Sequence, residues 1–202
     1  MILLPIATLK AQTQFVYLDK RFAYILTRDS VLSPDSVNYF CPVTSIAIFE
    51  KSTNKLIQKI TPAENTPYCH QDQKDLFILE DMNFDGFNDF RLFQFLPAAP
   101  NIPYYYWLYN PQKKEFELSK DLEEITSPEF DSSGKIITSH WRAGYGHYGQ
   151  STYKYINGKA TLIEETEFYL DEKDEAKTII EYRKRIKGKM ILIKRVVERN
   201  EK

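Results

Sequence analysis

A nine-residue acidic run between two short apolar segments constrains this chain more than any other feature. Residues 81–89 read Asp-Met-Asn-Phe-Asp-Gly-Phe-Asn-Asp, so oxygen-bearing side chains stand at the first, third, fifth and ninth positions and a glycine at the sixth. This is the spacing of the first half of an EF-hand loop, in which alternate side chains turn toward a cation that takes about 6–8 oxygen ligands. The run therefore predicts a calcium (Ca²⁺) loop.

The spacing also assigns the ligands of this loop. Gly86 permits the positive φ that follows the fifth ligand, and Leu92 stands at the twelfth position, where an EF-hand has a bidentate glutamate. The loop therefore lacks one standard ligand. The predicted metal ligands are the side chains of Asp81, Asn83, Asp85 and Asp89 and the backbone carbonyl of Phe87.

The flanks of the acidic run predict strands rather than EF-hand helices. Residues 76–79 and 90–95 are short, aromatic and branched, which is typical of a β-hairpin. A metal-free Asp-Gly turn is the alternative, because that dipeptide favours a hairpin by itself. Three carboxylates in one loop repel each other unless a cation neutralises them, and this favours a calcium loop at the hairpin tip.

The rest of the chain predicts an all-β fold. Aromatic residues make up 14% of the chain, and Asn157-Gly158 is a strong hairpin signal. We expect an antiparallel hairpin meander, packed as a sandwich, an open barrel or a propeller-like ring. Residues 119–125 predict one helical turn, and 171–177 a charged connection or a short helix. The remaining predicted strands are 43–49, 56–60, 104–109, 115–118, 135–140, 151–156, 159–169, 178–186 and 189–197.

Length and charge limit the classes of function. The 202 residues fit one domain, which we place at residues 12–202. A net charge of −1 offers no broad electrostatic attraction for nucleic acid, and no later segment is apolar over the roughly 18 residues of a membrane helix. Residues 183–199 are locally basic, and the sequence predicts a solvated hairpin there.

Two features indicate export to the periplasm or secretion. Residues 1–11 resemble the apolar end and cleavage region of a signal peptide, with an N-terminal edge strand as the alternative. Cys41 and Cys69 are a disulfide candidate in an oxidising compartment, with two separate buried thiols as the alternative.

A glycine-rich aromatic segment is the candidate surface for a protein partner. Residues 141–149 lie between two predicted strands and contain three glycines, two tyrosines, a tryptophan, an arginine and a histidine. Aromatic and arginine side chains dominate interface energetics, so a mobile recognition loop is one interpretation and a tight structural loop is the other. The candidate partner-binding residues are Arg142, Gly144, Tyr145, His147 and Tyr148.

Catalytic motifs are weak in this sequence. The three histidines have no motif-spaced partner, and the pairs Glu123-Glu124 and Glu164-Glu165 are typical of solvated faces. We therefore expect no catalytic residues and no enzyme activity.

Three segments resemble a known family. Residues 81–91, 96–101 and 106–110 are similar to bacterial exported calcium-binding proteins related to immunity proteins against lysozyme-like effectors of type IV secretion systems. The resemblance covers roughly residues 40–160, and it implies a propeller-like, hairpin-rich fold that binds calcium and blocks a peptidoglycan-cleaving enzyme in the periplasm. The Ser-Gly-x-x-Tyr loop of neighbouring lysozyme inhibitors is replaced here by Ala143-Gly144, with Tyr148 one residue late.

The sequence thus favours an exported calcium-binding domain that binds a protein partner such as a lysozyme-like hydrolase. The alternatives are a calcium-dependent glycan hydrolase and a calcium-stabilised surface adhesion module.

Overall fold

The chain folds into antiparallel β-sheets. A computed structural model describes residues 12–29, 31–32, 39–67, 69, 72–97 and 100–200, so the predicted signal-peptide remnant at 1–11 lies outside the described residues. The strands are β1 (Gln12–Leu18), β2 (Phe22–Asp29), β3 (Val31–Leu32), β4 (Tyr39–Phe40), β5 (Val43–Glu50), β6 (Lys55–Ile60), β7 (Phe77–Glu80), β8 (Asp89–Phe93), β9 (Tyr104–Asn110), β10 (Glu115–Leu118), β11 (Pro128–Asp131), β12 (Ile136–Gly144), β13 (His147–Ile156), β14 (Lys159–Asp171), β15 (Asp174–Ile186) and β16 (Lys189–Arg199). The two short helices are α1 (Gln73–Leu76) and α2 (Lys120–Glu123).

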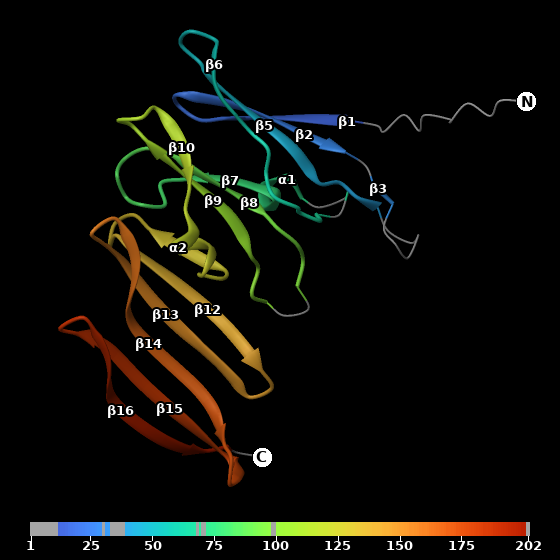
Figure 1. The fold of residues 1–202 in the computed structure, drawn as a ribbon. Coiled ribbons are helices and arrows are strands. Elements are labelled where there is room, and N and C mark those ends of the chain that lie inside the picture. The colour runs from blue at the N-terminus through green and yellow to red at the C-terminus, as the bar shows by residue number, and fades with distance from the viewer. Residues whose placement is uncertain are drawn as a thin grey trace, which may run out of the picture.

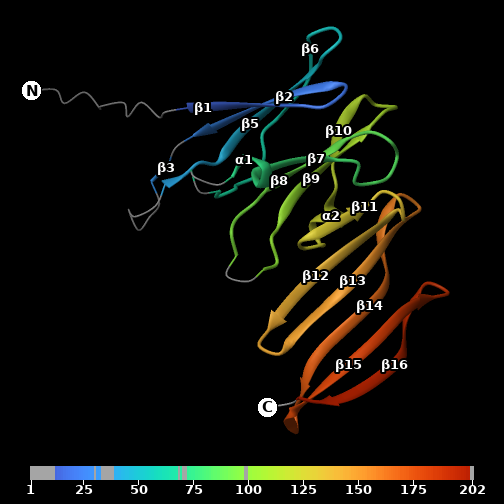
Figure 2. The same ribbon diagram turned by 180° about the vertical axis from the view of Figure 1, so that it is seen from behind.

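Three main sheets follow one another along the chain and in space (Figures 1 and 2). Their strand orders are β1-β2-β5-β6, β10-β9-β8-β7 and β11-β12-β13-β14-β15-β16, and β3 and β4 form a small fourth sheet. The predicted all-β class and antiparallel hairpins are confirmed. Over the described ranges these sheets close into neither a barrel nor a propeller.

The local turn chemistry explains why many predicted hairpins are found. Asn157 and Gly158 both have positive φ, at 52° and 75°, as a two-residue hairpin turn with the right twist requires. The structure also has strands that were not predicted: β1, β2, β3, β4 and β11. The connection expected at 171–177 is only a two-residue turn between β14 and β15, and Leu76 ends α1 instead of starting a strand.

Aromatic side chains fill the core between the first two sheets. Phe90 of β8 lies between Phe77 and Trp107, with ring centroids 5.0 Å from each, and Tyr24 of β2 reaches it from the first sheet at 5.7 Å. Gln58 of β6 joins the facing edges, because its side chain both donates to and accepts from the backbone of Phe116. This arrangement fixes the middle sheet as the rigid base of the acidic loop.

The six-stranded sheet is attached to that base by its first strands. Arg91 of β8 donates to the Pro128 carbonyl over 3.0 Å and pairs with Glu80 over 2.8 Å, and its guanidinium lies 5.5 Å from the Phe130 ring centre. β14 to β16 extend away from the first two sheets (Figures 1 and 2). Neither of the described helices is long and apolar enough to cross a membrane.

Cys41 and Cys69 form a disulfide that spans 28 positions of sequence. Cys41 also donates its backbone N–H to the Pro67 carbonyl over 2.8 Å, so the bond fastens the segment after β6 to the start of β5.

Replacing both cysteines with serine should lower the free energy of unfolding by about 3–4 kcal/mol, because the open chain regains the entropy of a loop of this length. Urea unfolding of the double variant and of the oxidised parent measures the difference. A midpoint equal to that of the parent would show that the bond adds no stability.

Candidate functional site

The acidic loop forms the tip of the β7–β8 hairpin, as predicted. Asp81 accepts backbone N–H bonds from Asp85 (3.0 Å) and Gly86 (2.8 Å), and Asn83 accepts one from Asp85 (3.1 Å). Asp85 in turn accepts a bond from Phe87 N–H over 2.9 Å. The first, third and fifth side chains therefore fold toward the backbone of their own loop.

The backbone of this loop is left-handed at two positions. Gly86 has a φ of +92°, in agreement with the prediction, and no atom lies within 4 Å of the position where a Cβ would stand. Phe84 has a φ of 62°, which is uncommon for a bulky residue. The ring packs against Phe130 and Tyr155 at centroid distances of 6.5 and 6.3 Å, so the loop contacts the six-stranded sheet.

Asp89 differs from the other predicted ligands because it is fully buried. Its two oxygens accept N–H bonds from Met82 (2.9 Å) and from Tyr109 of β9 (2.8 Å). Burial raises its pKa to about 7, and the charges of Asp85 and Asp81 act in the same direction, while the two hydrogen bonds oppose the rise. Asp89 thus anchors the loop to the middle sheet.

Metal binding at this loop stays a prediction. In the part of the chain that the structure describes, no three histidine, cysteine, aspartate or glutamate side chains form a group able to hold a metal ion. Asn83 and the Phe87 carbonyl belong to the predicted ligand set but not to those four residue types.

Of the two interpretations of residues 141–149, a mobile loop and a tight one, the structure has the tight form, a hairpin. β12 extends to Gly144 and β13 begins at His147, so only Tyr145 and Gly146 form the turn. Tyr145 is 90% exposed at the tip. Asn101, in the loop before β9, holds the backbone of Arg142 through two hydrogen bonds. Its side chain donates to the Arg142 carbonyl over 2.7 Å and accepts from the Arg142 N–H over 2.9 Å.

The predicted partner-binding side chains divide between two faces of the sheet. Arg142 is paired with Tyr148, whose ring stacks on Phe168 of β14 with a centroid distance of 4.9 Å and an interplanar angle of 8°. His147 lies on the opposite face. A hollow of about 510 Å³ adjoins Arg142 and Tyr148, and it is also lined by Pro100, Ser127, Glu129 and His140.

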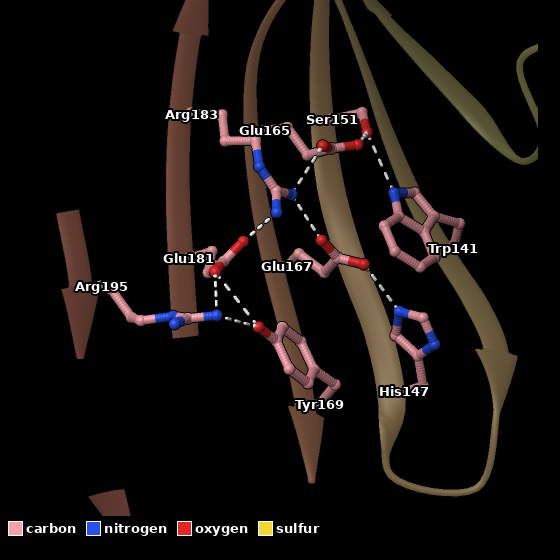
Figure 3. A network of polar contacts seen from close by, with 9 residues as sticks. All are labelled: Trp141, His147, Ser151, Glu165, Glu167, Tyr169, Glu181, Arg183 and Arg195. Carbon is pink, nitrogen blue, oxygen red and sulfur yellow. Dashed lines mark hydrogen bonds and ion pairs between the residues drawn. The ribbon is translucent and has the colours of Figure 1, made fainter. Parts of the chain in front are cut away.

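The face that carries His147 holds a polar network across β12 to β16 (Figure 3). Arg183 of β15 is its centre and contacts three carboxylates, those of Glu165, Glu167 and Glu181. His147 Nε2 lies 2.8 Å from Glu167 Oε1.

The network continues to the outermost strand, β16, and to β12 near the other edge of the sheet. Arg195 of β16 lies 2.7 Å from Glu181 Oε1, and Tyr169 donates to the same oxygen over 3.1 Å. Trp141 donates its indole N–H to Ser151 over 2.9 Å. The network therefore ties together the five strands from β12 to β16.

Ion pairing sets the electrostatics of this network. Burial raises the pKa of Glu167, but the hydrogen bonds from Arg183 and His147 outweigh it and hold the pKa below its usual value. The same bond to Glu167 is the main cause that raises the pKa of Arg183. Glu167 and Arg183 therefore both stay charged near neutral pH.

The hairpin predicted over 183–199 is found and β16 is largely exposed, but the sequence did not indicate that its Arg183 and Arg195 pair with carboxylates. Glu165, predicted as ordinary solvated surface, also contributes to the network. The available signal was the i, i+2 spacing of Glu165, Glu167 and Tyr169, and of Glu181 and Arg183. This spacing places each set on one face of a strand. The pairing of the two sets depends on the register between β14 and β15.

Comparisons with known proteins identify the fold. No protein-family model matches the chain. No curated protein matches it. The solved structure of a Xanthomonas protein described as related to the type IV secretion system is similar with a TM-score of 0.64 and 17% sequence identity, over 92% of this chain and 98% of that one. This similarity shows a shared fold.

Gly149→Ala should destabilise the protein by about 1–3 kcal/mol, because a Cβ there would lie 2.4 Å from the Trp141 ring and 2.7 Å from the Thr166 carbonyl. The ring must then move and lose its bond to Ser151. Thermal unfolding and tryptophan fluorescence in a Trp107→Phe background measure both effects. Gly158→Ala, which meets no atom within 4 Å but has positive φ, separates backbone strain from the clash. Unchanged Trp141 emission would contradict the prediction.

Proposed function

We propose that this chain is an exported, calcium-binding and non-enzymatic domain that binds and inhibits a lysozyme-like peptidoglycan hydrolase. The observation that carries this proposal is the rigid β12–β13 hairpin. It presents the exposed Tyr145, with Arg142 and the stacked Tyr148 beside a hollow. Preorganised aromatic and arginine side chains around a hollow are typical anchors of protein interfaces.

The donor chemistry of the acidic loop supports calcium as the ion. Carboxylate, amide and carbonyl oxygens are the ligands of this hard cation, and residues 81–89 offer all three kinds. Asp89 is buried near the charges of Asp81 and Asp85, which raise its pKa. A divalent cation would neutralise this repulsion and supply order to the loop.

Phe84 connects the proposed ion site to the sheet that presents the partner surface. Its ring contacts Phe130 of β11 and Tyr155 of β13, and Lys135 Nζ donates to its carbonyl over 3.3 Å. An ordered loop would therefore hold the six-stranded sheet against the middle sheet. Calcium has a structural role in this proposal.

The ion pairs formed by the network carboxylates support a role without catalysis. Glu165, Glu167 and Glu181 all contact Arg183, and Glu181 also pairs with Arg195. A general acid and base need carboxyl groups whose protonation can change during the reaction. Permanent ion pairs oppose that change, which favours a scaffold over a glycan hydrolase.

The similar fold of the Xanthomonas protein supports the choice of partner. That protein is described as related to a type IV secretion system, and the segments around residues 81–110 resemble immunity proteins against lysozyme-like effectors of such systems. A protein of this kind would protect the peptidoglycan of the cell that produces it.

Excess calcium should raise the thermal midpoint relative to EDTA, and Asp85→Ala should remove most of that rise. At a calcium concentration 100 times the Kd, the stabilisation would be about 2.7 kcal/mol. Asp131→Ala is the matched control, because Asp131 accepts similar bonds from Ser133 in a turn outside the loop. Equal midpoints in calcium, magnesium and EDTA would contradict calcium binding.

The purified protein should slow one or more muramidases in a panel, and Tyr145→Ala should weaken the inhibition about tenfold or more. Leu56→Ala, at an exposed apolar position on β6, should leave it unchanged. If the protein slows no muramidase in the panel, inhibition is rejected, and the calcium prediction is unaffected.

Two other outcomes would favour the alternative functions. Release of sugar from peptidoglycan by the protein alone would favour the hydrolase. Calcium-dependent binding to intact cell surfaces without inhibition would favour an adhesion module.

A further inference from the structure

The outer edge of β16 is a second surface of this protein, separate from the β12–β13 hairpin. β16 is the last strand of the six-stranded sheet, so in the described part of the chain one side of its backbone has no neighbouring strand. It runs for 11 residues without proline. A free edge of this length presents a row of unpaired N–H and C=O groups, which is a template for another strand.

The side chains along this edge are apolar to an unusual extent. Four of them are exposed by 43% to 55% and follow the strand from one end to the other. They are Ile191, Leu192, Ile193 and Val197. An exposed apolar edge strand normally marks an interaction site or a risk of aggregation.

The charged side chains of β16 are predominantly basic: Lys189, Lys194, Arg195 and Arg199, against one acidic residue, Glu198. Arg195 is already paired with Glu181, but Lys189 and Lys194 have no carboxylate partner among the described residues. The whole chain has a net charge of −1, so this edge differs in sign from the rest of the molecule. Lys194 Nζ lies 5.7 Å from the Tyr182 ring centre, a contact that leaves its charge uncompensated by a carboxylate. Basic residues without a carboxylate partner favour an acidic ligand.

The register places two exposed apolar side chains of β16 and two of its lysines on opposite faces, while Ile191, paired with Lys184, shares the face of the lysines. Leu192 is paired with Arg183 and Val197 with Ile179, on the face of the polar network. Lys194 is paired with Tyr182 and Lys189 with Ile186, on the other face. A strand added at this edge meets Leu192 and Val197 on one face, where Arg195 is already paired with Glu181. On the other face it meets the two lysines together with Ile191.

We propose that β16 binds an extended, acidic segment of a partner protein as an additional strand. The segment places aspartate or glutamate on the face of Lys189 and Lys194 and apolar residues on the face of Leu192 and Val197. Backbone hydrogen bonds supply affinity, and the alternation of acidic and apolar residues supplies specificity.

The charge pattern disfavours a second copy of this chain as the occupant. Pairing two β16 strands would bring predominantly basic side chains together, and like charges opposite each other in a sheet are destabilising. Lysines on an edge strand can serve only to prevent two copies from pairing. That role does not explain why Ile191, Leu192 and Ile193 are also exposed on the same strand.

The test uses a short capped peptide that alternates glutamate and valine, added to the isotope-labelled protein. The expected result is a shift of the amide resonances of residues 189–199, with binding about tenfold tighter than that of a lysine–valine peptide. The same glutamate–valine peptide with N-methyl groups on alternate residues should not bind, because it lacks the donors that strand addition needs.

The double variant Lys189→Glu and Lys194→Glu should reverse the preference to the lysine–valine peptide. Lys55→Glu with Lys59→Glu in β6, another edge strand with two lysines, is the matched control and should keep the parental preference. Equal binding of the methylated and unmethylated peptides, or resonance shifts only outside β16, would overturn the proposal. A concentration-dependent dimer that the first double variant abolishes would assign the edge to a second copy instead. None of these results depends on calcium or on muramidase inhibition.

Discussion

The buried carboxylate of Asp89 is the interaction on which the arrangement of the molecule depends. It joins the start of the acidic loop, at Met82, to the middle strand β9, at Tyr109. Asp89 is also the first residue of β8, next to Phe90 in the centre of the aromatic core. Because leaving a buried N–H without an acceptor costs about 1–3 kcal/mol, the loop is fixed to the sheet at the position where the core begins.

The same anchor determines how the two halves of the protein meet. With Met82 and Asp89 held, Phe84 is directed toward Phe130 and Tyr155 of the six-stranded sheet. Arg91, two residues after the anchor, reaches the Pro128 carbonyl of the same sheet. A short segment of β7, loop and β8 therefore positions all of β11 to β16.

Local chemistry is the part of this structure that the sequence predicts well. Asn157-Gly158 and the acidic loop specify their turns through residues within a few positions, and both hairpins are found. The sequence alone does not decide between a mobile and a tight form of residues 141–149, because the reason for Gly149 is a Trp141 ring that comes from the paired strand. A glycine in a strand interior is readily interpreted as part of a loop until its cross-strand neighbour is known.

Long-range register accounts for the remaining differences. Glu167 and Arg183 are 16 positions apart, and the bulges in the β14 and β15 pairings decide which side chains face each other. A shift of one strand by one residue would move every network side chain of that strand to the other face. The ion pairs resist such a shift between β14 and β15, since Arg183 would lose the carboxylates of Glu165 and Glu167 and keep only Glu181 of its own strand. The polar network thus helps to specify the register of the six-stranded sheet. That register in turn places Tyr145 at the β12–β13 turn and leaves β16 as the last strand of the described sheet.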